Sequence, residues 1–287
     1  MDFINGQELL ELCAKENLTI SQVMRRRELT CGNLTDEAID ARLRKILSIM
    51  QNAVAEPLKA PRRSMGGLIG GEAKMVAEFG QTDKSFCGSL LNKAISYSMA
   101  VLEVNATMGL IVAAPTAGSS GVLPGVLLAL QEERALPDEK IYEGLVNAAA
   151  VGYILMRNAS VSGAEAGCQA EVGAASAMAA SAVVEIMGGT PEMSLHAAAI
   201  ALSNLLGMVC DPIAGLVEAP CQSRNTIGAA NAITCAELAL AGVRHPIPFD
   251  EMVDAMYRVG KDIPFELRET AMGGCAATPT ACKFCCK

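Results

Sequence analysis

The stretch from Ala174 to Met187 consists almost entirely of alanine, serine and valine, and it constrains the fold more than any other part of the chain. Such a run predicts a helix that is packed on several sides, because it offers no continuous polar face to solvent. Hydrophobic residues make up 51% of the sequence, but only 3% of residues are aromatic and tryptophan is absent. Small side chains allow helices to approach closely. The sequence therefore predicts an all-α protein, folded as a single compact helical domain with buried, alanine-rich central helices.

The first sixty residues carry helix signals but no recognisable chemistry. Residues 5–31 are expected to form two short helices. Thr35 has the character of an N-cap, because acidic residues follow it and complement the positive end of a helix dipole. An apolar stripe then recurs at spacings of three and four residues until Pro57 and Pro61, which are expected to end the helix. No run alternates with the period of a β-strand. We interpret residues 1–60 as an N-terminal helical arm.

The segment Val104–Gln131 contains no charged residue, which raises the question of a membrane span. Pro115 and Pro124 interrupt it, and a polar loop lies at its centre, whereas a spanning helix needs roughly 20 continuous apolar residues. Two helices separated by a loop are the better interpretation. The N-terminus shows no signal-peptide pattern. The sequence thus predicts a cytoplasmic protein that does not bind membranes.

The net charge of −8 and the lack of any long basic run argue against nucleic acid as a partner. The dense cluster Arg25–Arg27 is interpreted as a solvated helix face. A glycine-rich turn over residues 63–72 lacks the lysine order of a phosphate-binding P-loop. Lys74 follows this turn and could face a substrate anion, or it could simply be a surface lysine.

A loop over residues 114–121 gathers small and hydroxyl-bearing side chains immediately before a helix is expected to begin. Backbone N–H groups and hydroxyls at such a position can converge on a carboxylate. The same pattern is also typical of an ordinary N-cap, and the residues alone leave both interpretations open. The candidates for binding a carboxylate are Thr116, Gly118, Ser119 and Ser120.

The chain contains 11 cysteines, and in a cytoplasmic protein these are unlikely to form a disulfide framework. Cys168, Cys210 and Cys221 are separated by 42 and 11 residues and stand among glycines, prolines and small side chains. This spacing is not that of a ferredoxin. It is compatible with a cluster that joins separate helices, or with three buried structural thiols. Four further cysteines have no such setting and are interpreted as small buried hydrophobes: Cys13, Cys31, Cys87 and Cys235.

Several blocks of this sequence, in the same order, are similar to the α chain of bacterial iron–sulfur L-serine dehydratase, and the resemblance extends from about Glu37 to Thr280. The blocks are Ala114-Pro-Thr-Ala-Gly-Ser-Ser-Gly121, Ser162-Gly-Ala-Glu-Ala-Gly-Cys168-Gln-Ala-Glu-Val-Gly173, Cys210-Asp-Pro212 and Pro220-Cys-Gln-Ser-Arg-Asn225. The resemblance implies a catalytic domain over residues 61–274. It also implies a [4Fe–4S] cluster bound by Cys168, Cys210 and Cys221, with one iron left open.

The reaction implied by the resemblance removes water from L-serine and yields 2-aminoacrylate, which hydrolyses to pyruvate and ammonia. The loop over residues 114–121 would bind the substrate carboxylate. Glu165 and Lys74 are the catalytic candidates within this chain, and Glu171 is a further possible base. Other residues of the resembling blocks could position substrate or donate hydrogen bonds to cluster sulfurs: Asn158, Ser162, Arg224 and Asn225.

Partners and the C-terminus also follow from the resemblance. Fused members of the family carry a Ser-Ser-His block that is absent here, which implies a separate β chain and a hetero-oligomer. In some relatives a terminal cysteine reaches back to the cluster. In the cysteine-rich tail over residues 275–287, Cys282 is best placed for this role, although Cys285 and Cys286 compete with it.

Three other functions fit parts of the pattern. A related family removes sulfide from L-cysteine, and its products would distinguish it. A pyridoxal-phosphate lyase would need a Schiff-base lysine and usually an α/β fold, neither of which the sequence indicates. A non-catalytic iron–sulfur scaffold or sensor would bind a cluster without turnover.

Overall fold

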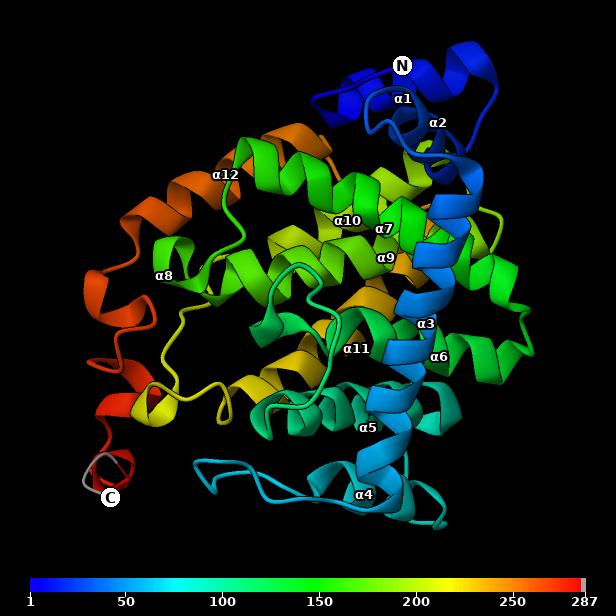
Figure 1. The fold of residues 1–287 in the computed structure, drawn as a ribbon. Coiled ribbons are helices and arrows are strands. Elements are labelled where there is room, and N and C mark those ends of the chain that lie inside the picture. Colours follow the sequence, from blue (N-terminus) through cyan, green and yellow to red (C-terminus); the bar gives the residue numbers. More distant parts are fainter. Residues whose placement is uncertain (285–287) are drawn as a thin grey trace.

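The computed structural model describes residues 1–284, in which helices are joined by loops and no strand of a sheet is formed (Figure 1). The all-α, single-domain prediction is confirmed. The α-helices are α1 (Gly6–Glu16), α2 (Ile20–Thr30), α3 (Asp36–Lys59), α4 (Glu72–Gly80), α5 (Gly88–Ala106), α6 (Val122–Arg134), α7 (Asp138–Asn158), α8 (Gly163–Ala166), α9 (Ala174–Ile186), α10 (Pro191–Asn204), α11 (Cys221–Leu240) and α12 (Phe249–Asp262). A 3-10 turn, η1 (Ala117–Ser119), and a π-turn, η2 (Gln169–Gly173), lie near the centre of the chain.

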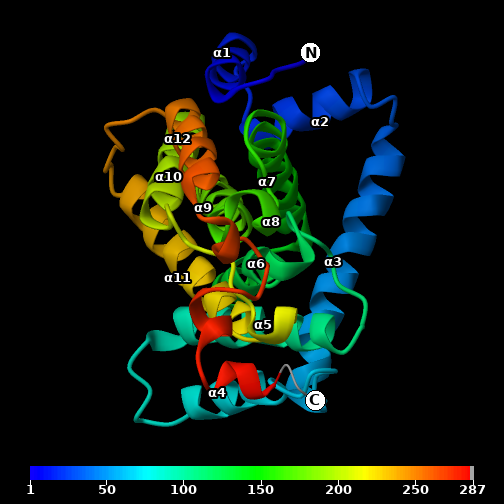
Figure 2. The ribbon, with the colours of Figure 1, turned by 90° about the vertical axis from the view of Figure 1, so that its left-hand side faces the viewer.

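Helix α9 is the central element, and every one of its residues is buried, as the alanine-rich sequence predicts. It packs against α6, α7, α10 and α11, which surround it in both ribbon views (Figures 1 and 2). Close approach depends on small residues on the neighbouring helices too. A Cβ atom added to Gly228 of α11 would lie 2.7 Å from Cγ1 of Val172 in η2. The packing therefore leaves no room for a larger side chain at this position.

The two short helices expected at the N-terminus are α1 and α2. Thr19 and Gln22 form a capping box at the start of α2. The buried carboxylate of Glu185 on α9 accepts hydrogen bonds from the Ser21 backbone N–H, at 3.2 Å, and from the Asn147 amide, at 2.7 Å. These bonds tie α2 to α7 and α9. The division of the chain at residue 60 stays a prediction.

Proline did not end the long third helix where the sequence suggested. Pro57 lies inside α3 and is buried, and the helix continues to Lys59. Proline removes one backbone donor, but the Ala60 N–H still bonds to the Glu56 carbonyl at 2.8 Å. The ring of Pro57 is buried in this last part of α3. Thr35 is the N-cap, as predicted, because its hydroxyl accepts from the Ala38 N–H.

Two helix boundaries determine the loops that carry candidate site residues. Helix α5 ends at Ala106, since Met108 takes a left-handed conformation with φ 59° and the Gly109 N–H donates to the Val104 carbonyl. Helix α11 begins at Cys221, directly after Pro220.

The uncharged stretch that raised the question of a membrane divides into α5, a loop and α6. None of the helices in residues 1–284 combines the length and the apolar character that crossing a membrane requires.

The burial of α9 generates the first prediction. Ala179 is 0% exposed, so Ala179→Leu inserts three carbon atoms into a filled core and should lower the free energy of unfolding by about 1–3 kcal/mol. Urea denaturation followed by circular dichroism measures this change. The matched control is Ala55→Leu on the exposed side of α3, which should change it by less than about 0.5 kcal/mol. Equal denaturation midpoints for both variants would contradict this account of the core.

Candidate functional site

The three cysteines of the resembling blocks lie at ends of helices and in a braced loop. Cys168 directly precedes η2, and Cys221 is the first residue of α11. Cys210 lies in the segment between α10 and α11, where its N–H donates to the Leu267 carbonyl at 2.9 Å and its carbonyl accepts from the Glu269 N–H at 2.6 Å. The C-terminal segment therefore fixes the backbone of Cys210.

The thiols of these cysteines influence each other electrostatically. Burial raises the pKa of Cys168 and of Cys221 to about 12, and burial also raises the pKa of Cys210. Negative charge on Cys168 raises the pKa of the other two thiols further, and Cys221 does the same to Cys210. Burial and these charge effects disfavour the thiolate forms of all three cysteines unless positive charge is brought in.

Glu171 in η2 lies beside this group. Its Oε1 accepts a hydrogen bond from Thr116 Oγ1 at 2.6 Å, and its Oε2 lies 3.8 Å from Cys210 Sγ. Burial is the main cause of the raised pKa of this carboxyl group. Glycines leave the space that it occupies: a Cβ atom on Gly163 would lie 2.5 Å from Glu171 Oε2 and 2.9 Å from Cys210 Sγ, and one on Gly118 would lie 3.0 Å from Glu171 Oε1.

The loop that contains Thr116 and Gly118 is closed by its own hydroxyl groups. Ser119 and Ser120 are both fully buried. Ser120 Oγ donates to the Ala117 carbonyl at 2.8 Å, and Ser119 Oγ lies 3.1 Å from Thr116 Oγ1. The serines thus shape the loop, while Thr116 connects it to Glu171.

Asn225 on α11 holds this loop against the cysteine group. Its Oδ1 accepts from the Gly121 N–H at 3.0 Å, and its Nδ2 donates to the carbonyls of Gly118 and Cys221 at 2.8 and 2.9 Å. The fully buried amide is engaged on both sides. Asn225 therefore acts as a structural link between the loop and the first turn of α11.

Arg224 is held next to the cysteines by a buried acid. Its Nη1 lies 2.6 Å from Asp211 Oδ1 and donates to the Val209 carbonyl at 2.8 Å. The other oxygen of Asp211 accepts from the backbone N–H of Cys275 at 2.6 Å. The positive charge of Arg224 opposes the rise in the pKa of Cys168. It supplies a fixed cation on one side of the group.

Two further candidates lie on α8, next to Cys168 but without contact to its thiol. Glu165 is exposed and accepts a hydrogen bond from Ser160 Oγ at 2.6 Å. Ser162 is the N-cap residue of α8, and its N–H donates to Ser160 Oγ at 3.1 Å. The Ser160 hydroxyl group thus connects the N-cap residue of α8 with Glu165.

Lys74 and Asn158 are placed apart from the cysteine group. Lys74 lies on α4, where its Nζ is 4.0 Å from Glu78 Oε1. Asn158 ends α7, and its Nδ2 donates to the Ile4 carbonyl at 2.6 Å. Within residues 1–284, no hydrogen bond or ion pair joins either side chain to the cysteines or to the loop at Thr116.

Sequence reasoning gave little weight to residues that the structure places at the centre. Glu171 is the only charged residue between Glu165 and Glu185, and this isolation in an apolar run was an available signal. Asp211 and Arg268 were not considered. Arg268 pairs with Cys210 in an isolated β-bridge, its Nη1 donates to the Glu165 carbonyl at 3.4 Å, and its buried Nε has no partner within the described part of the chain.

The cysteines of the C-terminal tail differ in their contacts. Cys282 is exposed and its Sγ lies 3.9 Å from the Ala276 carbonyl oxygen. Cys275 approaches the group more closely, through its N–H bond to Asp211. Cys285 and Cys286 lie outside the described residues. The hypothesis that Cys282 closes an open iron stays a prediction.

The donor set fits an iron–sulfur cluster. Cys168 and Cys210 are buried and Cys221 is partly exposed, and burial is the main cause of the raised pKa of all three thiols. Among residues 1–284, no group of three histidine, cysteine, aspartate or glutamate side chains lies close enough to hold a single ion. A cluster is held by thiolates bound to different irons, so its ligands are more widely separated than those of one ion. The irons would also bring the positive charge that buried thiolates need.

Comparisons with known proteins find relatives that match nearly the whole chain. A model of the family described as serine dehydratase alpha chain matches residues 15–276. The chain is 48% identical over 278 residues to the probable L-serine dehydratase, alpha chain, of Bacillus subtilis, covering 97% of this chain and 92% of that one. It is 42% identical over 279 residues to the L-serine dehydratase, alpha chain, of Peptoniphilus asaccharolyticus, covering 97% and 96%. The L-serine dehydratase of Helicobacter pylori is 37% identical over 285 residues, which are 96% of this chain and 62% of that protein.

The raised pKa values predict how the metal-free protein reacts with iodoacetamide. Only the thiolate is alkylated, and raising a thiol pKa from 9.0 to about 12 lowers the thiolate fraction at pH 8 roughly 1000-fold. Cys168 should therefore be labelled far more slowly than the exposed Cys31, with a rate that rises about tenfold per pH unit. Mass spectrometry of tryptic peptides measures both rates, and labelling in urea is the control. Equal rates in the folded protein would contradict the burial of Cys168.

Proposed function

The chain belongs to the serine dehydratase alpha chain family, and we propose that it is the α chain of an iron–sulfur L-serine ammonia-lyase. The observation that carries the proposal is the position of the Glu171 carboxyl group, which contacts both the Cys210 thiol and the hydroxyl-rich loop at Thr116. The relatives that are separate chains are named L-serine dehydratase, alpha chain, and they match over nearly their whole length.

Cys168, Cys210 and Cys221 would hold a [4Fe–4S] cluster. When bound, the cluster supplies a Lewis acid, because three thiolates leave one of its irons without a cysteine ligand. The chain contributes the surroundings: Gly163 leaves the space in which the Glu171 carboxyl group lies beside Cys210, and Arg224 provides a positive charge that favours the thiolate of Cys168.

The loop over residues 114–121 is proposed to bind the α-carboxylate of L-serine. Its backbone is fixed by Ser119, Ser120 and the amide of Asn225 before substrate arrives, which reduces the ordering needed on binding. Thr116 then stands between the bound amino acid and Glu171. The loop thus orients substrate toward the cysteine group.

Glu171 is the group within this chain that is best placed to transfer a proton. It contacts both Thr116 and the Cys210 side chain, whereas Glu165 and Lys74 contact neither. Its raised pKa favours the neutral acid, which can protonate the departing hydroxyl group so that it leaves as water. Loss of the α-proton to a separate base completes the elimination, and the resulting 2-aminoacrylate takes up water to give pyruvate and ammonia.

The base for the α-proton is proposed to come from a separate β chain, in a hetero-oligomer located in the cytoplasm. This chain has two histidines. His196 lies on α10, where burial lowers its pKa, and His245 lies in an exposed loop with its Nδ1 bonded to Ile247. Neither has a bond to the cysteine group among the described contacts. The name alpha chain carried by the relatives supports a partner of this kind.

Activity after anaerobic co-expression with the cognate β chain tests the proposal. We expect pyruvate from L-serine and visible cluster absorption, and Cys210→Ser should remove both. Cys235→Ser is the matched control, because this buried thiol is hydrogen-bonded to Asn204 of α10 and Asn231 of α11 and not, among the described contacts, to the cysteine group. Sulfide from L-cysteine without pyruvate from L-serine would indicate a different lyase. Full iron content without any turnover would indicate a scaffold or sensor.

The role of the loop predicts a separate kinetic effect. Ser119→Ala removes a hydroxyl group that supports Thr116, and kcat/KM for L-serine should fall about two- to tenfold, the equivalent of one neutral hydrogen bond. The matched control is Ser194→Ala on α10, since this serine is equally buried and its hydroxyl has no partner among the described residues. Unchanged kinetics in Ser119→Ala, with iron content intact, would show that the loop acts only as a helix cap.

A further inference from the structure

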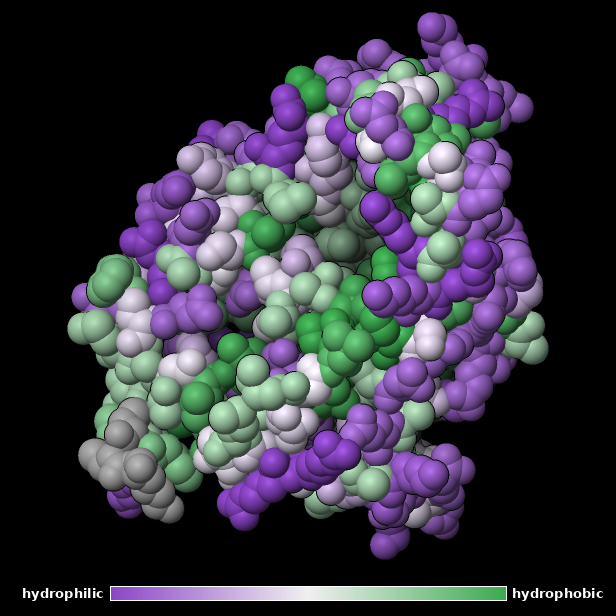
Figure 3. All heavy atoms as spheres, in the orientation of Figure 1, coloured by the Kyte–Doolittle hydropathy of each residue, from purple (hydrophilic) through white to green (hydrophobic). Residues whose placement is uncertain are grey.

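An apolar groove of about 470 Å³ lies between α2, α3, α7 and the loop that precedes Pro115. Hydrophobic atoms gather in and around this hollow on the molecular surface (Figure 3). L-serine is small and polar, so the groove does not suit the proposed substrate. The walls are formed largely by aliphatic and thioether side chains, among them Leu43, Ile46, Val112, Leu123, Met156 and Met178.

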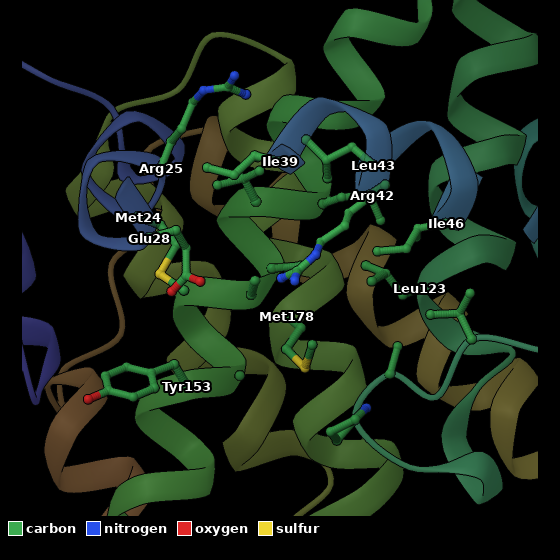
Figure 4. A pocket seen from close by; sticks show the side chains of 18 of the residues that line it. Met24, Arg25, Glu28, Ile39, Arg42, Leu43, Ile46, Leu123, Tyr153 and Met178 are labelled. Carbon is green, nitrogen blue, oxygen red and sulfur yellow. The ribbon is translucent and has the colours of Figure 1, made fainter. Parts of the chain in front are cut away.

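A single positive charge in this groove lacks a partner. Figure 4 shows Arg42 reaching from α3 into the groove toward Met178. Arg25, on the same rim, is paired with Asp36 and Asp40 at 2.7 Å. Within residues 1–284, Arg42 has neither a salt bridge nor a hydrogen bond. A cation framed by apolar walls is complementary to an apolar segment that carries a carboxylate.

The apolar surface continues beyond the groove. Met156 on its wall is 63% exposed, and the adjoining loop exposes Met108 by 79% and Leu110 by 70%. Large apolar side chains exposed next to one another are typical of protein interaction sites. The combined surface extends further than a small molecule would cover, which favours a protein segment as the occupant.

The same groove adjoins the proposed active site. Ala114 and Pro115 form part of its wall, and the next residue, Thr116, donates its hydrogen bond to Glu171. A protein bound in the groove would therefore touch the loop that is proposed to bind substrate. In the Helicobacter pylori relative, more than a third of the protein lies outside the match to this chain, so a second polypeptide portion accompanies this domain there.

We propose that this groove is the docking surface for the β chain, and that an apolar segment of the β chain places an acidic side chain against Arg42. The proposal rests on the function proposed above, because it assumes that a β chain exists. Docking here brings the β chain to the loop over residues 114–121, where its base is needed. The occupant is thus a partner of defined chemistry, seated next to the site that it completes.

Charge reversal in the groove tests the proposal. Arg42→Glu should raise the Kd for the cognate β chain at least about tenfold, because like charges would then face each other. Met156→Glu should act in the same direction by placing a charge on the apolar wall. The matched control is Arg44→Glu on the same helix, because Arg44 is exposed and lies outside the groove; its Kd should change less than about twofold. Binding is measured by biolayer interferometry, and circular dichroism verifies helicity.

The outcomes separate this proposal from the one on which it rests. If Arg42→Glu and Met156→Glu bind the β chain like the unaltered chain, the docking site is wrong, while serine turnover by the unaltered complex still supports the function. If both variants lose binding but the unaltered complex does not turn over L-serine, the docking site holds and the function fails. If the chain alone forms a dimer that Arg42→Glu dissociates, the groove binds a second copy and the proposal is overturned.

Discussion

A helix without any solvent-exposed residue determines much of this structure. Because α9 is buried on all sides, the helices around it must approach closely, and small residues on both partners permit this. The π-turn η2 runs directly into α9, so burial of α9 fixes the position of Cys168 at its start. Gly228 packs α11 against η2 in turn. The separation of Cys168 from Cys221, at the start of α11, thus follows from helix packing.

The site formed in this way concentrates groups that resist ionisation. The buried thiols of Cys168 and Cys210, the partly buried thiol of Cys221 and the carboxyl group of Glu171 would repel one another if all were ionised, and burial removes the water that would stabilise these charges. Arg224 cannot balance these charges alone, since Asp211 already pairs with it. A multiply charged metal group would reverse this cost, because it converts the same crowding of negative groups into favourable contacts.

Local signals in the sequence predicted the elements well, and long-range contacts account for what was missed. The caps at Thr19 and Thr35 and the burial of α9 depend on neighbouring residues, which the sequence displays directly. The contact of Thr116 with Glu171 spans 55 positions, and that of Gly121 with Asn225 spans 104. The hydrophobic periodicity of a sequence does not reveal which distant residues are in contact.

The glycine-rich turn near residue 66 shows the same limit of sequence reasoning. Its sequence lacks the lysine order of a P-loop, and nothing local indicated that Glu218, some 150 positions away, would accept bonds from Ser64, Gly66 and Leu68. A buried carboxylate already occupies the place that an anion would take. The turn therefore braces the segment before Cys221. Asn225, Asp211 and Glu218 each join the first turn of α11, or the segment before it, to a part of the chain that is distant in sequence. The order of this centre therefore depends on tertiary contacts.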